Sequence, residues 1–138
     1  MELEQGINYF AVLVSAVVFF IIGAVWYGAV FGKSFAAALN FSEDDRQKAQ
    51  KAFGRNLTVH FIGGFLVSYM MAHMIQLFEK PTWIDGIHTG AGAWFGFVFP
   101  LAWIMLVFER RPPATFWINN GNWLVSFSVV SAILALWR

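Results

Sequence analysis

The sequence predicts an all-α integral membrane protein with four transmembrane helices, at about residues 7–30, 57–78, 86–108 and 116–137, packed as an antiparallel bundle. Three observations predict this fold class. The composition is 59% hydrophobic and only 12% charged, whereas an average soluble domain has roughly 25% charged residues. The four segments contain no Lys, Arg, Asp or Glu, and each reaches the length of about 20 residues that a membrane-spanning helix needs. The basic residues gather in two of the three connections between these segments.

Length, charge and cysteine content exclude several classes of protein. A chain of 138 residues is long enough for one domain, so we expect a single four-span domain over residues 1–138. The net charge of +1 and the lack of a basic run argue against a nucleic-acid partner. The chain has no cysteine, which excludes disulfides and thiolate metal sites. No motif for a cofactor is found, so we expect none, and the lipid bilayer is the expected surrounding partner.

The first connection, between the first two spans, is too long for a plain turn. Ser42 is a typical N-cap residue, and the next three residues, Glu43, Asp44 and Asp45, favour the positive end of a helix. Basic residues follow in the later turns, where they favour the negative end. We therefore expect a short amphipathic helix at about residues 43–53 in this connection.

The distribution of Lys and Arg predicts the orientation in the membrane. The first and third connections, residues 31–56 and 109–115, hold seven of the nine basic residues. Cytoplasmic connections carry an excess of Lys and Arg, so these two connections are expected in the cytoplasm and both termini on the outer side. The seven residues are Lys33, Arg46, Lys48, Lys51, Arg55, Arg110 and Arg111, while Lys80 and Arg138 fall on the opposite side.

Polar and aromatic residues from the predicted spans and from the connections beside them gather at one predicted depth, near the cytoplasmic ends of the helices. Polar side chains such as asparagine are costly in lipid unless they are hydrogen-bonded, so these groups should face the protein interior. We call the set the cytoplasmic polar layer; it consists of Trp26, Tyr27, Lys33, Asn56, His60, Glu109, Asn119 and Asn122.

Two interpretations of the cytoplasmic polar layer are open at the level of the sequence. The layer could be a structural lock that fixes how the helices align, because polar contacts between membrane helices are common. It could instead line a cytoplasm-facing cavity that binds an anionic or polar small molecule. Taken singly, Trp26 and Tyr27 also fit an aromatic belt at the membrane surface, and Lys33 could extend to anionic lipid.

A second, weaker cluster lies at the outer end of the chain. His73 is near the end of the second span and His88 near the start of the third, and the short connection between these spans could bring the two imidazoles together. Two histidines with a nearby carboxylate could bind zinc or a similar ion. The residues do not follow a known metal-ligand spacing, and histidines bonded to neighbours or water are the simpler interpretation.

Glycines recur along the third span and indicate a close helix contact. Gly86 and Gly90 are four residues apart, as are Gly92 and Gly96, and such stripes allow another helix to approach. The partner helix could belong to the same chain or to a second protomer. Pro100, further along, is expected to kink this helix.

Three stretches of the sequence are characteristic: "INYFAVLVSAVVFFIIGAVWYGAVFGKSF", "FSEDD" and "FWINNGNWLVSFSVVSAIL". Through them the whole chain resembles a bacterial family of small membrane proteins, domain of unknown function 1761. It implies a four-span helical membrane protein and brings no activity with it. The most specific positions are Gly23, Trp26, Tyr27, Phe31, Gly32 and Lys33, with Trp117, Asn119 and Gly121.

These observations predict a non-enzymatic protein of the bacterial inner membrane. Catalytic motifs and acidic relays inside the spans are missing from the sequence, whereas aromatic surface and small-residue stripes favour association. The expected role is therefore that of a homo-oligomer or of a small accessory subunit of a membrane complex. The alternative is a small-molecule or lipid binding or transport protein with a polar cavity at the cytoplasmic end, and a metal-binding membrane protein is a more remote alternative.

Overall fold

The computed structural model describes residues 6–138, and all regular elements among them are helical, as predicted. The domain predicted over residues 1–138 also includes residues 1–5, which lie outside the described part. Two short segments, labelled η, are π-helical turns in which hydrogen bonds join residues five apart. In chain order the elements are α1 (Tyr9–Val25), η1 (Trp26–Val30), α2 (Gly32–Ala38), α3 (Glu43–Lys51), α4 (Phe53–Ile75), α5 (Trp83–Ala93), η2 (Trp94–Val98), α6 (Phe99–Phe108) and α7 (Pro113–Leu136).

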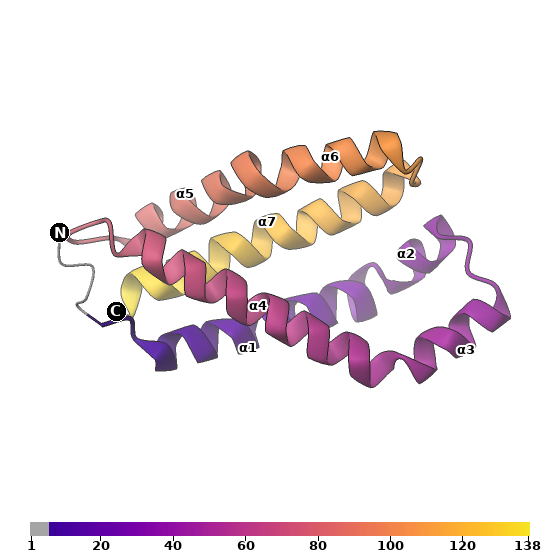
Figure 1. Cartoon of the computed structure of the whole chain (residues 1–138), viewed down its shortest axis with the longest axis horizontal. Helices are drawn as coiled ribbons and strands as arrows, with labels where there is room; N and C mark the ends of the chain where they lie inside the picture. Colours follow the sequence, from indigo (N-terminus) through magenta and orange to yellow (C-terminus); the bar gives the residue numbers. More distant parts are fainter. Residues whose placement is uncertain (1–5) are drawn as a thin grey trace.

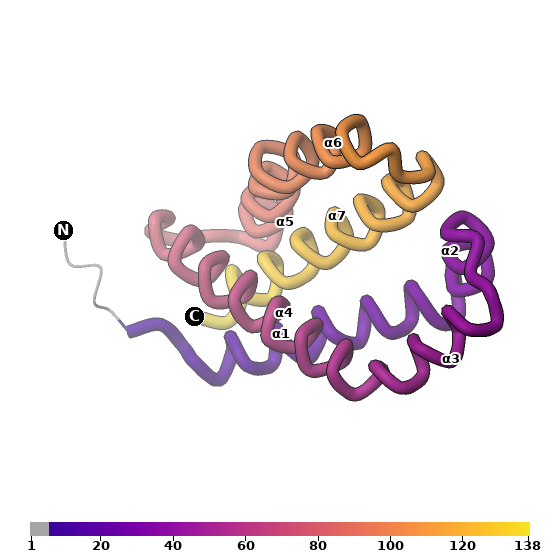
Figure 2. Tube along the Cα trace, turned by 45° about the vertical axis from the view of Figure 1, so that its right-hand side comes forward, coloured from indigo at the N-terminus to yellow at the C-terminus, as the bar shows by residue number. Residues whose placement is uncertain are grey.

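Helix α7 lies at the centre of the molecule (Figures 1 and 2). It packs against α5 on one side and against α1 and α4 on the other, and α1 and α4 also pack against each other. Chain direction alternates between consecutive long segments, so that α1 runs opposite to α4 and the α5–α6 segment runs opposite to α7 (Figure 1). The most deeply buried apolar side chains, including Val12, Ile75 and Val130, come from α1, α4 and α7.

The prediction of four membrane-spanning helices needs a correction, because only three described segments are long and apolar enough to cross a membrane. These are Tyr9–Val30, Phe53–Ile75 and Trp83–Phe108. Helix α7 is 24 residues long but falls short in apolar character, since three asparagines lie in its first half. Its central position gives the physical reason, because a helix surrounded by other helices can direct polar side chains at protein instead of lipid.

The helix expected in the first connection is present as α3, and it ends two residues earlier than predicted. The Ser42 side chain accepts a hydrogen bond from the backbone N–H of Asp45, and the Asp45 carboxylate accepts one from the backbone N–H of Ser42. This reciprocal capping box satisfies two backbone donors at the start of the helix. None of the residues of α3 is buried, so this helix lies on the surface, outside the packed core.

The two π-helical turns share a local sequence. Each begins with Trp, an aromatic residue and Gly, and each is followed by Phe, as in "WYGAVF" and "WFGFVF". In η1 the N–H of Phe31 donates to the carbonyl oxygen of Trp26 over 2.8 Å. In η2 the π turn ends at Val98, and Pro100 follows as the second residue of α6. The residue that lacks an N–H therefore lies where the hydrogen-bond pattern changes from π to α. The expected disturbance near Pro100 therefore takes the form of a π turn.

The glycine stripe of the third span divides into two halves with different surroundings. Gly86 and Gly90 face α7 so closely that an added Cβ would lie 2.5 Å from the Ser131 carbonyl oxygen and 2.2 Å from that of Phe127, respectively. Gly92 and Gly96 have no atom within 4 Å of the position where a Cβ would be. Gly86 and Gly90 therefore explain the close packing of α5 on α7, whereas Gly92 and Gly96 face no other part of the described chain.

Candidate functional site

Trp26, the first residue of η1, joins the first span to α7. Its indole Nε1 donates a hydrogen bond of 2.9 Å to the backbone carbonyl oxygen of Ile118. The six-membered part of the indole lies over Gly121, where an added Cβ would be 2.8 Å from Cζ2 of the ring. Phe31 packs against the same indole with ring centroids 4.9 Å apart. A glycine at position 121 is thus what gives the indole its space beside α7.

Tyr27 makes a second connection between the same two segments. Its hydroxyl donates to the side-chain oxygen of Asn119 over 2.5 Å, and the Asn122 side chain also lies beside this hydroxyl. Asn122 is fully buried, and its Oδ1 accepts a 3.3 Å hydrogen bond from Ser126. The Phe35 ring of α2 covers the Tyr27 ring edge-on at 5.2 Å. The first half of α7 therefore supplies the Asn119 amide that holds η1 in place.

His60 lies at the same end of the molecule as Trp26 and Tyr27, but it contacts α1 instead of α7. Its imidazole fills the space above Gly23, where an added Cβ would lie 2.2 Å from Nε2. Phe19 and Phe20 flank the imidazole with ring centroids 5.4 and 5.8 Å away. Nε2 is buried and has no hydrogen-bond partner among the described residues. His60 therefore acts in this structure as a packed side chain between α1 and α4.

Three members of the cytoplasmic polar layer are not brought into the interior. Lys33 and Asn56 are exposed, and Glu109 is exposed and pairs with Arg111 in the turn before α7. The remaining five, Trp26, Tyr27, His60, Asn119 and Asn122, are half-buried or buried. The hydrogen bonds of Trp26 and Tyr27 show that these two residues share a level with Asn119, whereas the direction of each side chain required the structure.

The interior part of the cytoplasmic polar layer is closely packed. A cavity at this end has a volume of about 50 Å³ and lies between α6 and α7, with Thr115, Asn119 and Asn120 in its wall. A space of this size holds a few water molecules at most. The hydrogen bonds of Trp26 and Tyr27 meanwhile tie η1 to α7 directly. Chemically, this arrangement can fix the alignment of the helices.

The two histidines considered for metal binding lie apart from any ligand set. His73 packs edge-on against Tyr69 with ring centroids 4.7 Å apart, and His88 is exposed. Within residues 6–138, no group of three or more His, Asp or Glu side chains is placed to hold a metal ion. The described part of the chain thus offers no set of ligands to which a metal site could be assigned.

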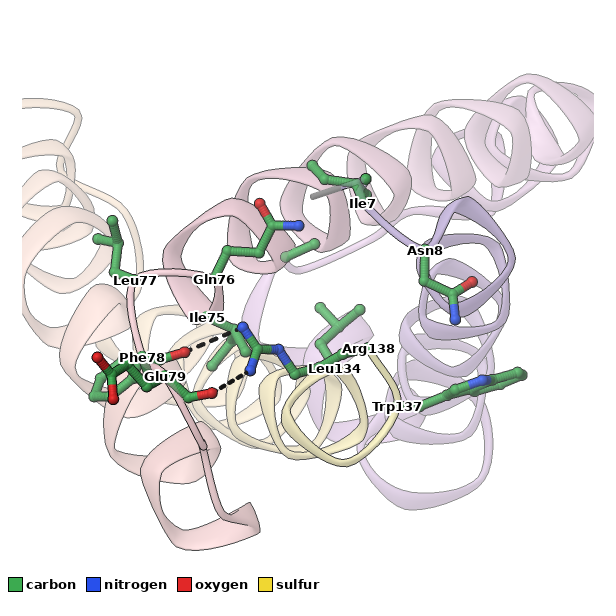
Figure 3. Close-up of a pocket in the computed structure, with 12 residues that line it drawn as sticks. Ile7, Asn8, Ile75, Gln76, Leu77, Phe78, Glu79, Leu134, Trp137 and Arg138 are labelled. Atoms are coloured by element: carbon green, nitrogen blue, oxygen red, sulfur yellow. Dashed lines mark hydrogen bonds between the residues drawn. The ribbon is translucent and has the colours of Figure 1, made fainter. Parts of the chain in front are cut away.

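A larger cavity lies at the opposite end, where α1 begins and α4 and α7 end (Figure 3). It has a volume of about 650 Å³, within the usual range of small-molecule sites. Arg138 crosses one side of it and donates to the backbone carbonyl oxygens of Glu79 and Phe78 over 2.9 and 3.1 Å. Sequence reasoning missed this cavity because its walls come from three distant segments. The one signal for it was Arg138, an isolated cation on the predicted outer side.

Comparison with known proteins identifies the family. A model of the family described as protein of unknown function (DUF1761) matches residues 10–135. The chain belongs to the DUF1761 family. None of the curated proteins and none of the solved structures matches it significantly. The DUF1761 match therefore confirms the resemblance seen in the sequence and assigns no activity to any residue.

Proposed function

We propose that this DUF1761 protein is a non-enzymatic, four-span protein of the bacterial inner membrane that acts by association with another membrane helix. The associating surface is the outer face of the segment from α5 to α6, and the partner is a second copy or a larger membrane complex in which the chain is an accessory subunit. The observation that carries the proposal is the open pair of glycines, Gly92 and Gly96, on this face.

The case for a fourth span rests on the position of α7. It has 24 residues and packs between the other long helices. A helix of this length spans about 36 Å at a rise of 1.5 Å per residue, enough for a hydrocarbon core of about 30 Å. Its asparagines are half-buried or buried in protein, which removes the main cost of placing them in a membrane.

The segment from α5 to α6 is the least covered of the three apolar spans. In its most apolar stretch 6% of the residues are buried, against 33% in Tyr9–Val30 and 28% in Phe53–Ile75. None of the residues of α6 is buried. Lipid alone can cover apolar side chains, so this exposure is compatible both with a monomer and with association. The glycines of this segment favour association.

A glycine in a helix is less stable than an alanine by roughly 0.5–1 kcal/mol. Gly86 and Gly90 offset that cost through their close approach to α7, whereas Gly92 and Gly96 make no such contact within the chain. Glycines spaced by four residues on an open membrane helix allow the backbone of another helix to approach closely. A partner helix on this face would therefore give these two glycines the contact that the chain lacks.

The test is association of the full chain in lipid nanodiscs, measured by native mass spectrometry and by energy transfer between labelled copies. Gly92→Leu and Gly96→Leu should weaken association about tenfold, which corresponds to about 1.4 kcal/mol. Gly63→Leu is the matched control, because Gly63 is also open but lies on α4. A partnerless monomer in mild detergent and in native-membrane extracts would contradict the proposal.

Cross-linking can locate the interface because the chain has no cysteine of its own. Phe95→Cys, on the proposed face, should form a disulfide-linked dimer or a cross-link to a partner subunit. Leu66→Cys, on the exposed face of α4, should not, and the two positions are similarly exposed at 65% and 57%. Equal cross-linking at both positions would indicate random collision and would count against a defined face.

A further inference from the structure

The 650 Å³ cavity at the outer end is assembled from the start of α1, the end of α4 and the end of α7 (Figure 3). Its floor is apolar and well packed, since Ile75, Leu134 and Ala72 are almost fully buried. Its side walls carry polar groups, among them Asn8 and Arg138. The cavity thus combines a firm apolar base with polar groups near its opening, which is the usual composition of a binding site.

Arg138 brings a positive charge to this cavity and forms no ion pair with a described side-chain carboxylate, while Glu79 also lines the cavity. Its guanidinium donates to two backbone carbonyl oxygens, those of Phe78 and Glu79, and makes no ion pair within residues 6–138. The carbonyl contacts fix the guanidinium in position and use only some of its N–H groups. A guanidinium that is fixed in position and still has unused N–H donors is suited to bind an anionic oxygen.

Asn8 supplies a second donor, and its orientation is fixed by the helix that it caps. Its Oδ1 accepts a hydrogen bond of 3.0 Å from the backbone N–H of Ala11, so the Nδ2 group is the one left over. Within the described chain this amide nitrogen has no acceptor. In Figure 3, Asn8, just before α1, and Arg138, two residues beyond the end of α7, lie on either side of Leu134. The cavity therefore offers donors, one of them charged, from two sides.

The surroundings of the cavity identify the kind of molecule that carries the anion. The cavity lies where the long helices end, which is the depth of lipid headgroups, and Trp137 stands at its edge, packed edge-on against Phe10 at 5.3 Å. Aromatic residues with a polar edge are enriched at this depth. Leu77, also in the cavity wall, is 68% exposed and is available to an acyl chain. These features describe a molecule with an anionic head and an apolar tail.

We propose that this cavity binds the headgroup of an anionic phospholipid, with the phosphate oxygens on Arg138 and on Nδ2 of Asn8. The predicted orientation puts this site in the outer leaflet. The proposal concerns a different surface from the association face of α5 and α6, so either can fail without the other.

The test is lipid binding to the purified full chain, followed by native mass spectrometry with phosphatidylglycerol and with zwitterionic phosphatidylcholine of the same chain length. Phosphatidylglycerol should be retained about tenfold more strongly by the unmodified protein. Arg138→Gln should remove most of this preference, while Lys80→Gln, an exposed cation in the neighbouring connection, should leave it unchanged. Retention of the full preference by Arg138→Gln would overturn the proposal.

A second variant separates loss of binding from loss of structure. Asp caps a helix as well as Asn does, so Asn8→Asp should preserve α1 and at the same time place a negative charge in the cavity. It should weaken phosphatidylglycerol binding about tenfold without lowering the unfolding temperature. Inorganic phosphate added in millimolar excess should not displace the lipid. Displacement by inorganic phosphate, or unchanged binding in Asn8→Asp, would rule out a lipid headgroup site.

Discussion

The indole nitrogen of Trp26 donates a 2.9 Å hydrogen bond to the backbone carbonyl oxygen of Ile118, 92 residues further along the chain. The acceptor is a carbonyl inside α7, so this bond fixes the rotation and the height of the first span relative to the central helix. Tyr27 repeats the connection one residue later through Asn119. The consecutive pair Trp26 and Tyr27 thus acts as one clamp on α7.

The first prediction concerns the contribution of this clamp to stability. Trp26→Phe keeps an aromatic ring beside Gly121 and removes the N–H donor. We expect the free energy of unfolding to fall by about 1 kcal/mol, the typical net value of one hydrogen bond, plus a smaller packing loss. Unfolding in mixed micelles with increasing denaturing detergent would measure it. Trp117→Phe is the control, because Trp117 is 65% exposed, and an equal loss there would show that the indole bond to Ile118 contributes nothing specific.

The second prediction concerns Gly23 and the imidazole of His60. A methyl group on residue 23 would lie 2.2 Å from Nε2 of His60, far inside van der Waals contact, so Gly23→Ala should destabilise the protein by roughly 1–3 kcal/mol through overpacking. The double variant Gly23→Ala with His60→Ala should cost clearly less than the sum of the two single changes. Gly63→Ala, at an open position of α4, should be neutral or slightly stabilising. Strict additivity in the cycle would contradict direct contact between the two residues.

The third prediction concerns the pH dependence of α3. The backbone N–H of Ser42 donates to the Asp45 carboxylate and, with the Ser42 side chain and then Lys48, lowers the pKa of Asp45 below its usual value. A carboxyl whose pKa is lower in the folded state stabilises that state above its unfolded pKa, about 3.9, and loses this effect as pH falls through the folded value. Hydrogen-exchange protection of α3 should therefore be constant from pH 7 to 5 and decrease below about pH 4.

Asp45→Asn provides the control for this pH effect. It removes the titrating group, so α3 should be less protected at pH 7 and its protection should change little on acidification. The amides of α4 serve as an internal reference, because the interior of that helix depends on packing and not on the capping box. Loss of protection in α3 and α4 together would indicate general acid unfolding instead of a local cap.

Local signals in the sequence predicted local structure well. Ser42 and the acidic residues after it predicted where α3 begins, because a capping box depends on residues three positions apart. Depth along the spans likewise predicted that Trp26, Tyr27 and Asn119 share a level. What the sequence could not supply was the direction of each side chain around its helix. Lys33 was predicted at the same depth as Tyr27, but it comes after a π turn. Because a π turn changes the direction in which the following side chains point, Lys33 is exposed.

The parts of the structure that depend on distant segments were missed or misjudged. The cavity of Figure 3 is lined by residues of distant segments, among them Asn8, Gln76 and Arg138, and no periodicity within one span encodes such a meeting. The central position of α7 was also not visible: its asparagines were expected to face the protein interior, but the sequence does not show on which of the four predicted spans the others pack. In the structure α7 is the helix on which the others pack, and its polar groups are explained by that position.

The last prediction concerns the orientation of the chain and the fourth span together. Single cysteines can be introduced at Ser34, Lys80, Ala114 and Trp137, all exposed, because the chain has no cysteine to interfere. Right-side-out and inverted membrane vesicles would then be treated with a maleimide that does not cross membranes. We expect Lys80→Cys and Trp137→Cys to react only in right-side-out vesicles, because the basic connections stay in the cytoplasm. Ser34→Cys and Ala114→Cys should react only in inverted vesicles. Reaction of Ala114→Cys and Trp137→Cys from the same side would mean that α7 does not cross the membrane, and the proposal of four spans would then be wrong.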